Sequence, residues 1–412
     1  MVFYVLVGGL SAVVTFALSF IILKLSLRFR LYPKIRERDV HTRPTPRLGG
    51  VAMFLGVLVA FGVASQLDRF HLVFVNPEPV LGLLAAALLI VLIGVADDIW
   101  DLDWLTKLAG QMIAAGLLVW QGIQLTTLPI GGVTIVPPVT GLVLTVIAVV
   151  LVMNAVNFID GLDGLVAGVA LLANGVFFIY TYILSNGMGE SEYFNLASLI
   201  TVALAGACLG FLPLNWHPAR LFMGDAGALL VGLLMAASAI SVTGQVDPAA
   251  LESGRQLLPA FIPILLPFAV LIVPLLDFAL AVVRRLRAGK SPFSADRQHL
   301  HHRLLDMGHS HFHAVLIFYA WTAVVAIGTL LFMFVPWGWA LAFVAAGFTL
   351  SAWFTLAPLT KRKVLEASVQ LARPGSDASI DARLDPLDEA ANESILDDGR
   401  PLRPRHHSKE PS

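Results

Sequence analysis

The densest set of polar residues in the chain lies in one short stretch between two long apolar runs. Asn154, Asn157 and Asp160 follow one another at intervals of three. Asp163 comes three residues later, and a glycine follows each of the two acids. On a helix this interval places the first three side chains near one stripe, and the glycines let the backbone approach a bound phosphate or nucleoside. Two amides and two acids are more than a polar helix end needs, so we interpret the stretch as a substrate site, with the helix end as the alternative.

Two further acidic groups lie at the ends of other apolar runs. Asp97 and Asp98 come directly after one run, and because neighbouring carboxylates repel each other, we expect one of them to bind a cation or keep its proton. Asp225 lies in a Gly-Asp-x-Gly string at the start of another predicted helix, where backbone N–H groups face an anion. Oxygen ligands from several loops suit Mg²⁺ shared with substrate phosphates. The acids therefore predict such a site, whereas a solvated helix end explains Asp101 and Asp103 equally well.

A basic, histidine-rich loop lies further along the chain, within residues 291 to 303. It contains Arg297, His299, His301 and His302. Imidazole donates hydrogen bonds and carries protons near neutral pH. We interpret the loop as an electropositive lid over a diphosphate, and keep a zinc site and a basic interfacial helix on anionic lipid as alternatives.

The composition shows what must position these residues. Of the 412 residues, 57% are hydrophobic and 13% are charged, against about 45–50% and about 25% in soluble domains. A bilayer core needs about 20 apolar residues per helix, and backbone polar groups cannot stay unpaired in lipid, so the apolar runs must be helices. The formal net charge of −1 offers no basic excess for nucleic acid. The single Cys208 excludes an intramolecular disulfide and a thiolate metal cluster.

We predict an all-α fold, a polytopic integral membrane bundle of about eleven transmembrane helices. The predicted spans lie near residues 3 to 27, 48 to 66, 80 to 96, 105 to 121, 139 to 156, 164 to 184, 196 to 214, 225 to 243, 258 to 283, 314 to 335 and 339 to 358. The fourth is short and begins near Lys107.

Loop charges predict the orientation of these spans. Lys and Arg gather on one side, which the positive-inside rule assigns to the cytosol. The N-terminus is then outside and the C-terminus cytosolic, in a multi-pass protein of the plasma membrane whose acidic groups lie on the cytosolic side. We divide the chain into a transmembrane domain, residues 1 to 363, and a polar, disordered cytosolic tail, residues 364 to 412.

Two classes other than an enzyme are compatible with many spans. A secondary transporter also carries intramembrane acids, but transporters normally place charges near the midplane, whereas these acids lie at the cytosolic helix ends. A non-enzymatic membrane scaffold would not need three acidic groups. An enzyme that works at the cytosolic boundary is therefore favoured over both.

The motifs described above occur together in one known family. In chain order they are Asp97-Asp98, Asn154-x-x-Asn157-x-x-Asp160-Gly-x-Asp163-Gly, Gly224-Asp225-x-Gly227 and His299-x-His301-His302. Over about residues 33 to 310, the chain resembles the polyprenyl-phosphate N-acetylhexosamine-1-phosphate transferases, the MraY/WecA-like glycosyltransferase family 4. The resemblance implies an integral membrane enzyme that moves a sugar-1-phosphate from a UDP-sugar to a polyprenyl phosphate and releases UMP. It also implies Mg²⁺ as cofactor, with Mn²⁺ as an alternative ion.

Two branches of that family differ in their donor. MraY-like enzymes use UDP-MurNAc-pentapeptide, and WecA- or TagO-like enzymes use UDP-GlcNAc or a relative. The stretches from Pro274 to Arg285 and from Gly289 to His302 look like the WecA branch. The resemblance thus implies transfer of GlcNAc-1-phosphate to undecaprenyl or decaprenyl phosphate, which initiates a cell-envelope glycan. The pentapeptide donor stays the alternative, and a homodimer is the assembly we consider.

The resemblance also implies metal and catalytic roles. Asp225 is expected to ligate the metal, with Asn157 or Asp160 as its companion. Asp160 also belongs to the expected catalytic set with Asp97 and Asp98, the pair assigned to deprotonating or positioning the lipid phosphate. We expect the lipid phosphate to attack the sugar-linked phosphorus directly in line, with a two-step route through a phospho-aspartate left open.

The remaining candidate residues are expected to bind substrate. Phe222, three residues before Asp225, matches an aromatic residue that stacks on uracil. The residues expected to line the nucleoside and diphosphate site are Asn154, Asp160 and Asp163, and those expected to bind diphosphate or sugar from above are Arg297, His299, His301 and His302. Ala228 departs from the family pattern, which usually has serine there, so a hydroxyl hydrogen bond is missing while Asp225 is retained.

Overall fold

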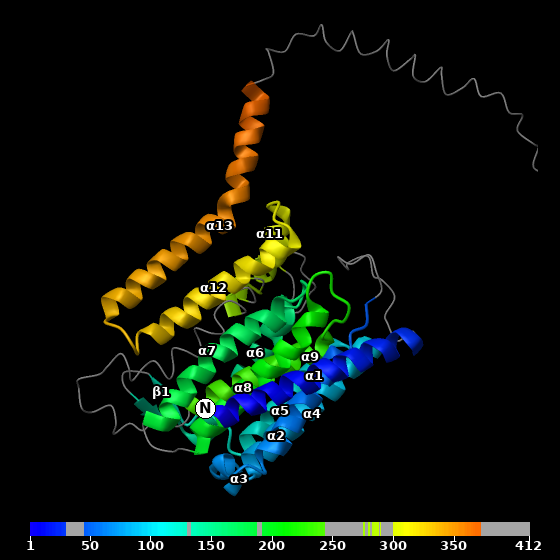
Figure 1. Cartoon of the computed structure of the whole chain (residues 1–412), viewed down its shortest axis with the longest axis vertical. Coiled ribbons are helices and arrows are strands. Elements are labelled where there is room, and N and C mark those ends of the chain that lie inside the picture. The colour runs from blue at the N-terminus through cyan, green and yellow to red at the C-terminus, as the bar shows by residue number, and fades with distance from the viewer. Residues whose placement is uncertain are drawn as a thin grey trace, which may run out of the picture. The chain divides into compact units, whose positions relative to one another are not determined.

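The structure is a computed structural model of the chain. It describes residues 1–29, 45–129, 133–187, 192–243 and 300–371, with a few residues between 275 and 289 (Figure 1). The helices are α1 (Val2–Phe29), α2 (Gly49–Ala64), η1 (Asp68–Phe70), α3 (His71–Val75), α4 (Glu78–Trp100), α5 (Trp104–Trp120), α6 (Pro138–Ile159), α7 (Leu165–Gly187), α8 (Glu192–Asn215), α9 (Gly224–Thr243), α11 (Leu300–Asp306), α12 (His311–Leu331) and α13 (Trp337–Leu371). The two strands are β1 (Thr127–Pro129) and β2 (Val133–Ile135).

The prediction of a multi-pass helical membrane protein is confirmed. Among the described residues, eight helices are long and apolar enough to cross a membrane, or nine if α2 and the helices after it, bent by 99°, form one span. The shorter helix α5, with 17 residues, accounts for a further predicted span. Most of the span predicted at 258 to 283 lies outside the described residues. The count of about eleven and the orientation of the N-terminus stay predictions.

A short β-hairpin was not predicted from the sequence. Strands β1 and β2 pair antiparallel, with Thr127 opposite Ile135. The Thr127 hydroxyl donates a hydrogen bond of 2.9 Å to the carbonyl oxygen of Thr243, the last residue of α9. The hairpin is therefore attached to the end of α9 that lies opposite Asp225.

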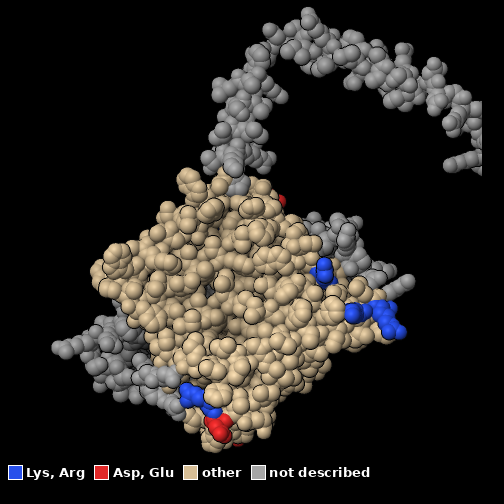
Figure 2. Space-filling model, in the orientation of Figure 1, with Lys and Arg blue, Asp and Glu red and all other residues tan. Residues whose placement is uncertain are grey.

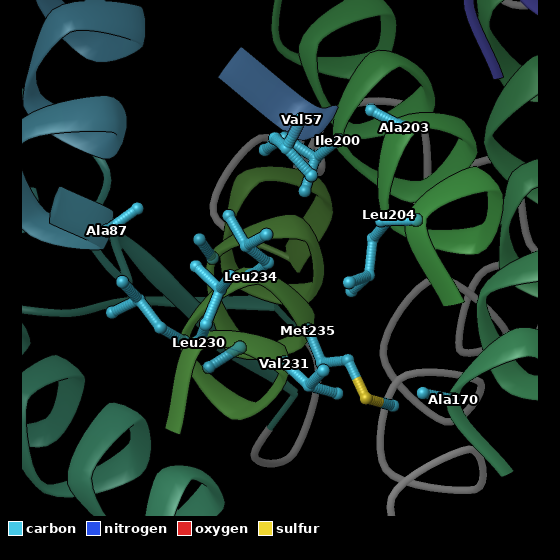
Figure 3. Close-up of a cluster of buried hydrophobic side chains, with 14 of the residues drawn as sticks. Val57, Ala87, Ala170, Ile200, Ala203, Leu204, Leu230, Val231, Leu234 and Met235 are labelled. Carbon is cyan, nitrogen blue, oxygen red and sulfur yellow. The ribbon is translucent and has the colours of Figure 1, made fainter. Parts of the chain in front are cut away.

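Helix α9 forms the centre of the core. In its apolar window, 94% of the residues are buried, against 11% for the window at Trp337–Ala357 in α13. Figure 3 shows side chains of α9 meeting side chains of α2, α4, α7 and α8. The residues labelled there belong to one hydrophobic cluster: from α9 Leu230, Val231, Leu234 and Met235, and from its neighbours Val57, Ala87, Ala170, Ile200, Ala203 and Leu204. A helix that is hydrophobic all round belongs inside a bundle, so α9 is a fixed support for the residues at its start.

The outer helix faces are apolar, as lipid contact requires. Large hydrophobic side chains such as Leu81, Leu92 and Trp353 are 60%, 57% and 73% exposed. On the face in Figure 2, the charged side chains of the described residues lie at a few separate places, and the broad middle of the face has none. An uncharged surface with many exposed large hydrophobic side chains indicates a lipid-facing exterior rather than a water-facing one.

The chain divides into two compact units, Met1–Leu356 and Ala357–Ser412. Within the first unit, α12 and α13 lie side by side, and the Trp321 indole donates to the Thr355 hydroxyl at 3.2 Å (Figure 1). The predicted tail begins at residue 364 inside α13, and residues 372–412 lie outside the described part of the chain. The boundary at 363 and the disorder of the tail therefore stay predictions.

Glycine brings α2 and α4 into direct contact with the start of α9. A Cβ on Gly94 of α4 would lie 2.3 Å from the backbone nitrogen of Ala226, and one on Gly50 of α2 would lie 2.2 Å from that of Gly227. Real Cβ atoms essentially never approach other atoms so closely. The two glycines thus let the first turn of α9 pack against two neighbouring helices.

Replacing Gly94 with alanine is expected to lower the thermal unfolding midpoint of the purified protein, because an added carbon in a filled contact costs about 1–3 kcal/mol. Gly116→Ala in α5 is the matched control, since a Cβ there meets nothing within 4 Å. In a helix interior alanine is favoured over glycine by about 0.5–1 kcal/mol. Circular dichroism melts in one detergent compare the two variants, and equal midpoints would contradict the close contact.

Candidate active site

Four helix ends that carry polar residues meet at one end of the bundle. They are the last turns of α4 and α6 and the first turns of α5 and α9. Helix α4 packs on α5 and α9, and α6 packs on the same two helices. Asp97, Lys107, Asn157 and Asp225 come from these four ends. Residues from distant parts of the sequence are thereby brought to one place.

Lys107 joins two of the predicted acids. Its ammonium group forms an ion pair with Asp97 Oδ2 and lies 2.9 Å from Asp225 Oδ2. The side chain of Asp97 is 8% exposed and that of Asp225 is 29% exposed. Two carboxylates this close would repel each other, and the ammonium between them offsets that repulsion. The structure thus brings Asp97 and Asp225 together on one cationic group.

Asp98 points to a different partner from its neighbour Asp97. Its Oδ2 lies against Gly224, the first residue of α9, where an added Cβ would be 2.3 Å from it, and Arg47 contributes a favourable charge interaction. The exposed N–H groups at a helix start and the helix dipole both favour a negative charge. Asp98 therefore fixes the end of α4 to the start of α9.

The two asparagines of α6 extend the polar site along that helix. Asn157 contributes a favourable interaction to the Asp225 carboxylate. One turn earlier, the amide of Asn154 donates to Gln111 Oε1 of α5 at 2.6 Å and to the Val150 carbonyl at 2.8 Å. Gln111 is 3% exposed and follows Lys107 by four residues, so both lie on the same face of α5. These contacts form a line of polar side chains between α5 and α6 that ends at Asp225.

The acids after α6 have separate surroundings. Asp160 is the C-cap residue of α6 and is half-buried. Asp163 is buried, and its Oδ2 accepts hydrogen bonds from His217 Nδ1 at 2.7 Å and from the backbone N–H of Ala219 at 3.0 Å. The structure therefore bonds Asp163 to the loop between α8 and α9. Its expected place in the nucleoside and diphosphate site stays a prediction.

Phe222 lies in the loop that leads into α9. Its backbone N–H donates to the Pro46 carbonyl at 2.8 Å, and its own carbonyl accepts from the Gly49 N–H at 2.9 Å. Gly224 follows with a φ of +67°, and a Cβ there would lie 2.2 Å from the Arg47 carbonyl oxygen. Only glycine suits this left-handed, crowded position. The segment before α2 thus holds the Phe222 loop, and the contact of Phe222 with uracil stays a prediction.

The histidine-rich loop is described only in part. Arg297 and His299 lie outside the described residues. His301 and His302 lie in α11, and their side chains are outside the described part of the chain. Their binding of diphosphate or sugar therefore stays a prediction, as do the alternatives of a zinc site and an interfacial helix.

Three site residues were missed in the sequence. From the sequence alone, Lys107 marks only the start of a predicted span, although a charged residue in an apolar helix is a functional candidate by default. Gln111, one turn on, repeats the polar position on the same face. His217 offered no spacing signal, because its partner Asp163 is distant in sequence.

Asp103 has a structural position. Its carboxylate is the N-cap of α5 and accepts from the backbone N–H groups of Leu105 and Thr106, both at 3.0 Å. Hydrogen bonds from Thr106, its side chain above all, hold the pKa of this carboxyl below its usual value. Asp103 thereby starts the helix that carries Lys107 four residues later.

The donors around Lys107 fit a magnesium ion. Among the described residues, no three His, Cys, Asp or Glu side chains form a complete ion-binding group. Mg²⁺ is usually bound by one or two carboxylates together with waters and substrate phosphates. Asp97 and Asp225 already converge on one cation beside the Asn157 amide. In addition, Asp97 Oδ1 is buried and accepts no hydrogen bond from the described part of the chain.

A multi-pass helical bundle with paired charges gathered at its helix ends is the architecture of a membrane enzyme that handles charged groups at the lipid boundary. Residues 80–243 match the profile of Glycosyl transferase family 4. The chain belongs to this family, as the sequence motifs predicted.

Relatives of the chain extend the similarity over most of its length. It is 42% identical over 361 residues to the decaprenyl-phosphate N-acetylglucosaminephosphotransferase of Mycolicibacterium smegmatis, which covers 87% of this chain and 89% of that protein. The enzyme of that name from Mycobacterium tuberculosis H37Rv is 42% identical over 327 residues, 78% of this chain and 81% of the relative. The probable undecaprenyl-phosphate N-acetylglucosaminyl 1-phosphate transferase of Bacillus subtilis is 30% identical over 310 residues, 73% and 76% of the two chains.

Replacing Lys107 with methionine is expected to lower the free energy of unfolding by about 1–3 kcal/mol, because it leaves Asp97 and Asp225 without their shared cation. Lys24→Met is the control, since Lys24 of α1 lies 4.5 Å over the ring of Phe20. Thermal unfolding in detergent measures both. Adding Asp97→Asn to the Lys107 variant is expected to restore part of the lost free energy of unfolding. If the double variant is less stable than the Lys107 variant, the shared ion pair is contradicted.

Proposed function

We propose that the chain transfers GlcNAc-1-phosphate from UDP-GlcNAc to a polyprenyl phosphate and releases UMP. The reaction takes place at the cytosolic face of the plasma membrane, requires Mg²⁺ and initiates a cell-envelope glycan. The relatives that are 42% identical are named for this transfer, with decaprenyl phosphate as the acceptor. The Bacillus relative is named for undecaprenyl phosphate, so the acceptor is stated as a polyprenyl phosphate.

The observation that carries the proposal is the ion pair of Lys107 with Asp97 and Asp225 at the helix ends. A polyprenyl phosphate cannot leave the bilayer and a nucleotide sugar cannot enter it, so the two can react only at the boundary. The charged site lies at the ends of long apolar helices, where both substrates have access. A secondary transporter, the alternative from another class, would place its charges near the midplane.

The residues around Lys107 support transfer by electrostatics. A donor diphosphate repels the negative phosphate that attacks it, and fixed cationic groups offset that repulsion without reorganising. The Lys107 ammonium is shared by carboxylates of two helices, which leaves a net negative charge to attract the divalent cation that would offset the repulsion. Asp97 or Asp98 acts as the base or the orienting group for the lipid phosphate, which attacks the sugar-linked phosphorus in line. A phospho-aspartate on one of the two acids is the alternative route.

Asp225 and Asn157 would hold the magnesium ion, with Asp97 as a further oxygen donor. A bound Mg²⁺ supplies charge that offsets the diphosphate and stabilises the UMP leaving group. Asp98 lies against Gly224, the residue before Asp225. Asp160, at the C-cap of α6, completes the proposed catalytic set with Asp97 and Asp98.

The donor can be tested directly. Purified protein with Mg²⁺ and polyprenyl phosphate is offered UDP-GlcNAc and UDP-MurNAc-pentapeptide in parallel, and released UMP is measured. UMP is expected with UDP-GlcNAc and not with the pentapeptide donor. Release with the pentapeptide donor alone would assign the chain to the other branch, and transport of a nucleotide sugar without UMP would favour the transporter.

Asp225→Asn is expected to lower turnover at least a hundredfold, because the variant loses the charge that would hold the metal at the start of α9. Asp103→Asn is the matched control, since asparagine also serves as an N-cap and Asp103 lies at the same end of the bundle. UMP release is measured for both over a range of Mg²⁺, with thermal melts to show that each is folded. Wild-type activity of Asp225→Asn at ordinary Mg²⁺ would remove Asp225 from the metal role.

A further inference from the structure

A histidine outside the family motifs holds the buried Asp163. His217 Nδ1 lies 2.7 Å from Asp163 Oδ2, and the backbone N–H of Ala219 donates to the same oxygen at 3.0 Å. A carboxylate can only accept, so Nδ1 is the atom that carries the hydrogen. A hydrogen bond to a charged group is among the strongest that a side chain makes. His217 and Ala219 therefore determine where this carboxylate points.

The backbone after Asp163 is held by the same loop. The N–H of Gly164 donates to Asn215 Oδ1 at 3.0 Å, and the amide of Asn215 donates to the Leu221 carbonyl at 3.0 Å. The Tyr319 hydroxyl donates to the Gly164 carbonyl at 2.6 Å. The turn that follows Asp160 is thus bonded to the α8–α9 loop and to α12.

Two consecutive residues of the α8–α9 loop also pack on the start of α12. The ring of His217 stacks on that of His311 with centroids 5.3 Å apart and planes 3° from parallel. Trp216 meets Phe312 edge to face at 6.0 Å. His217 is therefore placed by ring stacking on one side and bonded to Asp163 on the other.

The loop that contains His217 leads directly into Phe222 and Asp225. The hydrogen bond from His217 to Asp163 consequently joins two segments that the proposed function assigns to the donor: the turn after α6 and the approach to α9. A shift of one segment relative to the other would misalign the nucleotide between them, while the acids on α4 would keep their positions.

We propose that His217 is a positioning residue for the nucleotide donor, acting through its hydrogen bond to Asp163. This inference rests on the proposed function, because its readout is the KM for UDP-GlcNAc. Loss of the hydrogen bond raises that KM by about tenfold to a hundredfold, the range for a hydrogen bond to a charged group. The kcat and the KM for polyprenyl phosphate change by less than about threefold, within the context dependence of such bonds.

Substitutions at residue 217 separate the hydrogen bond from the ring stacking. His217→Asn keeps an N–H donor at the place of Nδ1 and removes the ring. His217→Phe keeps a ring that can stack on His311 and removes the donor. His217→Gln moves the side-chain N–H group away from Asp163, and it replaces the Phe variant in the test if that variant does not fold. His313→Phe is the control, since His313 is exposed on the first turn of α12 and pairs with Ser310.

UMP release by each full-length variant is measured with UDP-GlcNAc varied at saturating polyprenyl phosphate. It is then measured with polyprenyl phosphate varied at saturating UDP-GlcNAc. A raised donor KM for the Phe or Gln variant, with near wild-type values for the Asn and His313 variants, supports the proposal. A wild-type donor KM for the Phe or Gln variant overturns it, as does an Asn variant as impaired as the Phe variant. Wild-type protein that releases no UMP overturns the proposed function instead.

Discussion

The site depends on one ammonium group held between two carboxylates of different helices. Charged groups removed from water cost several kcal/mol each unless they are paired, so Asp97 and Asp225 can lie close together because Lys107 lies between them. Lys107 reaches this place because Asp103 starts α5 four residues earlier. The approach of α4 to α9 in turn requires Gly94, which leaves room for the first turn of α9. Packing, capping and charge pairing therefore act on the same few residues.

The location of the site at the helix ends follows from the bilayer. Helix α9 is almost completely buried, and apolar side chains of its neighbours enclose it. Its first turn bears Asp225, and its last residue, Thr243, accepts a hydrogen bond from the hairpin. A helix fixed along its whole length cannot adjust its start without moving its neighbours. The acid at that start is thus a rigid reference position, with Asp98 against the preceding Gly224 and Asn157 contributing a favourable interaction.

The sequence predicted the helical membrane fold and the juxtaposition of Asp97 with Asp225, because both acids lie at span ends on the same predicted side. It did not reveal Lys107, since a positive charge at a span end is also the normal topology signal. The hairpin was missed because its strands have only three residues each. His217 could not be found at all, because its hydrogen bond to Asp163 joins residues 54 positions apart. Contacts between distant segments are set by packing, which periodicity does not encode.

Acids that look alike in the sequence divide into two kinds in the structure. Asp103 accepts hydrogen bonds from two backbone N–H groups at the start of α5, which makes it a support for local structure. Asp97 instead faces a side-chain cation and has a buried oxygen that accepts no hydrogen bond among the described residues. Asp98 is similar, because its buried Oδ2 accepts no hydrogen bond among the described residues. A carboxylate oxygen that accepts no hydrogen bond can bind a new ligand without breaking a contact of the fold. This property distinguishes acids that can bind a metal or a substrate from acids that only hold a helix end in place.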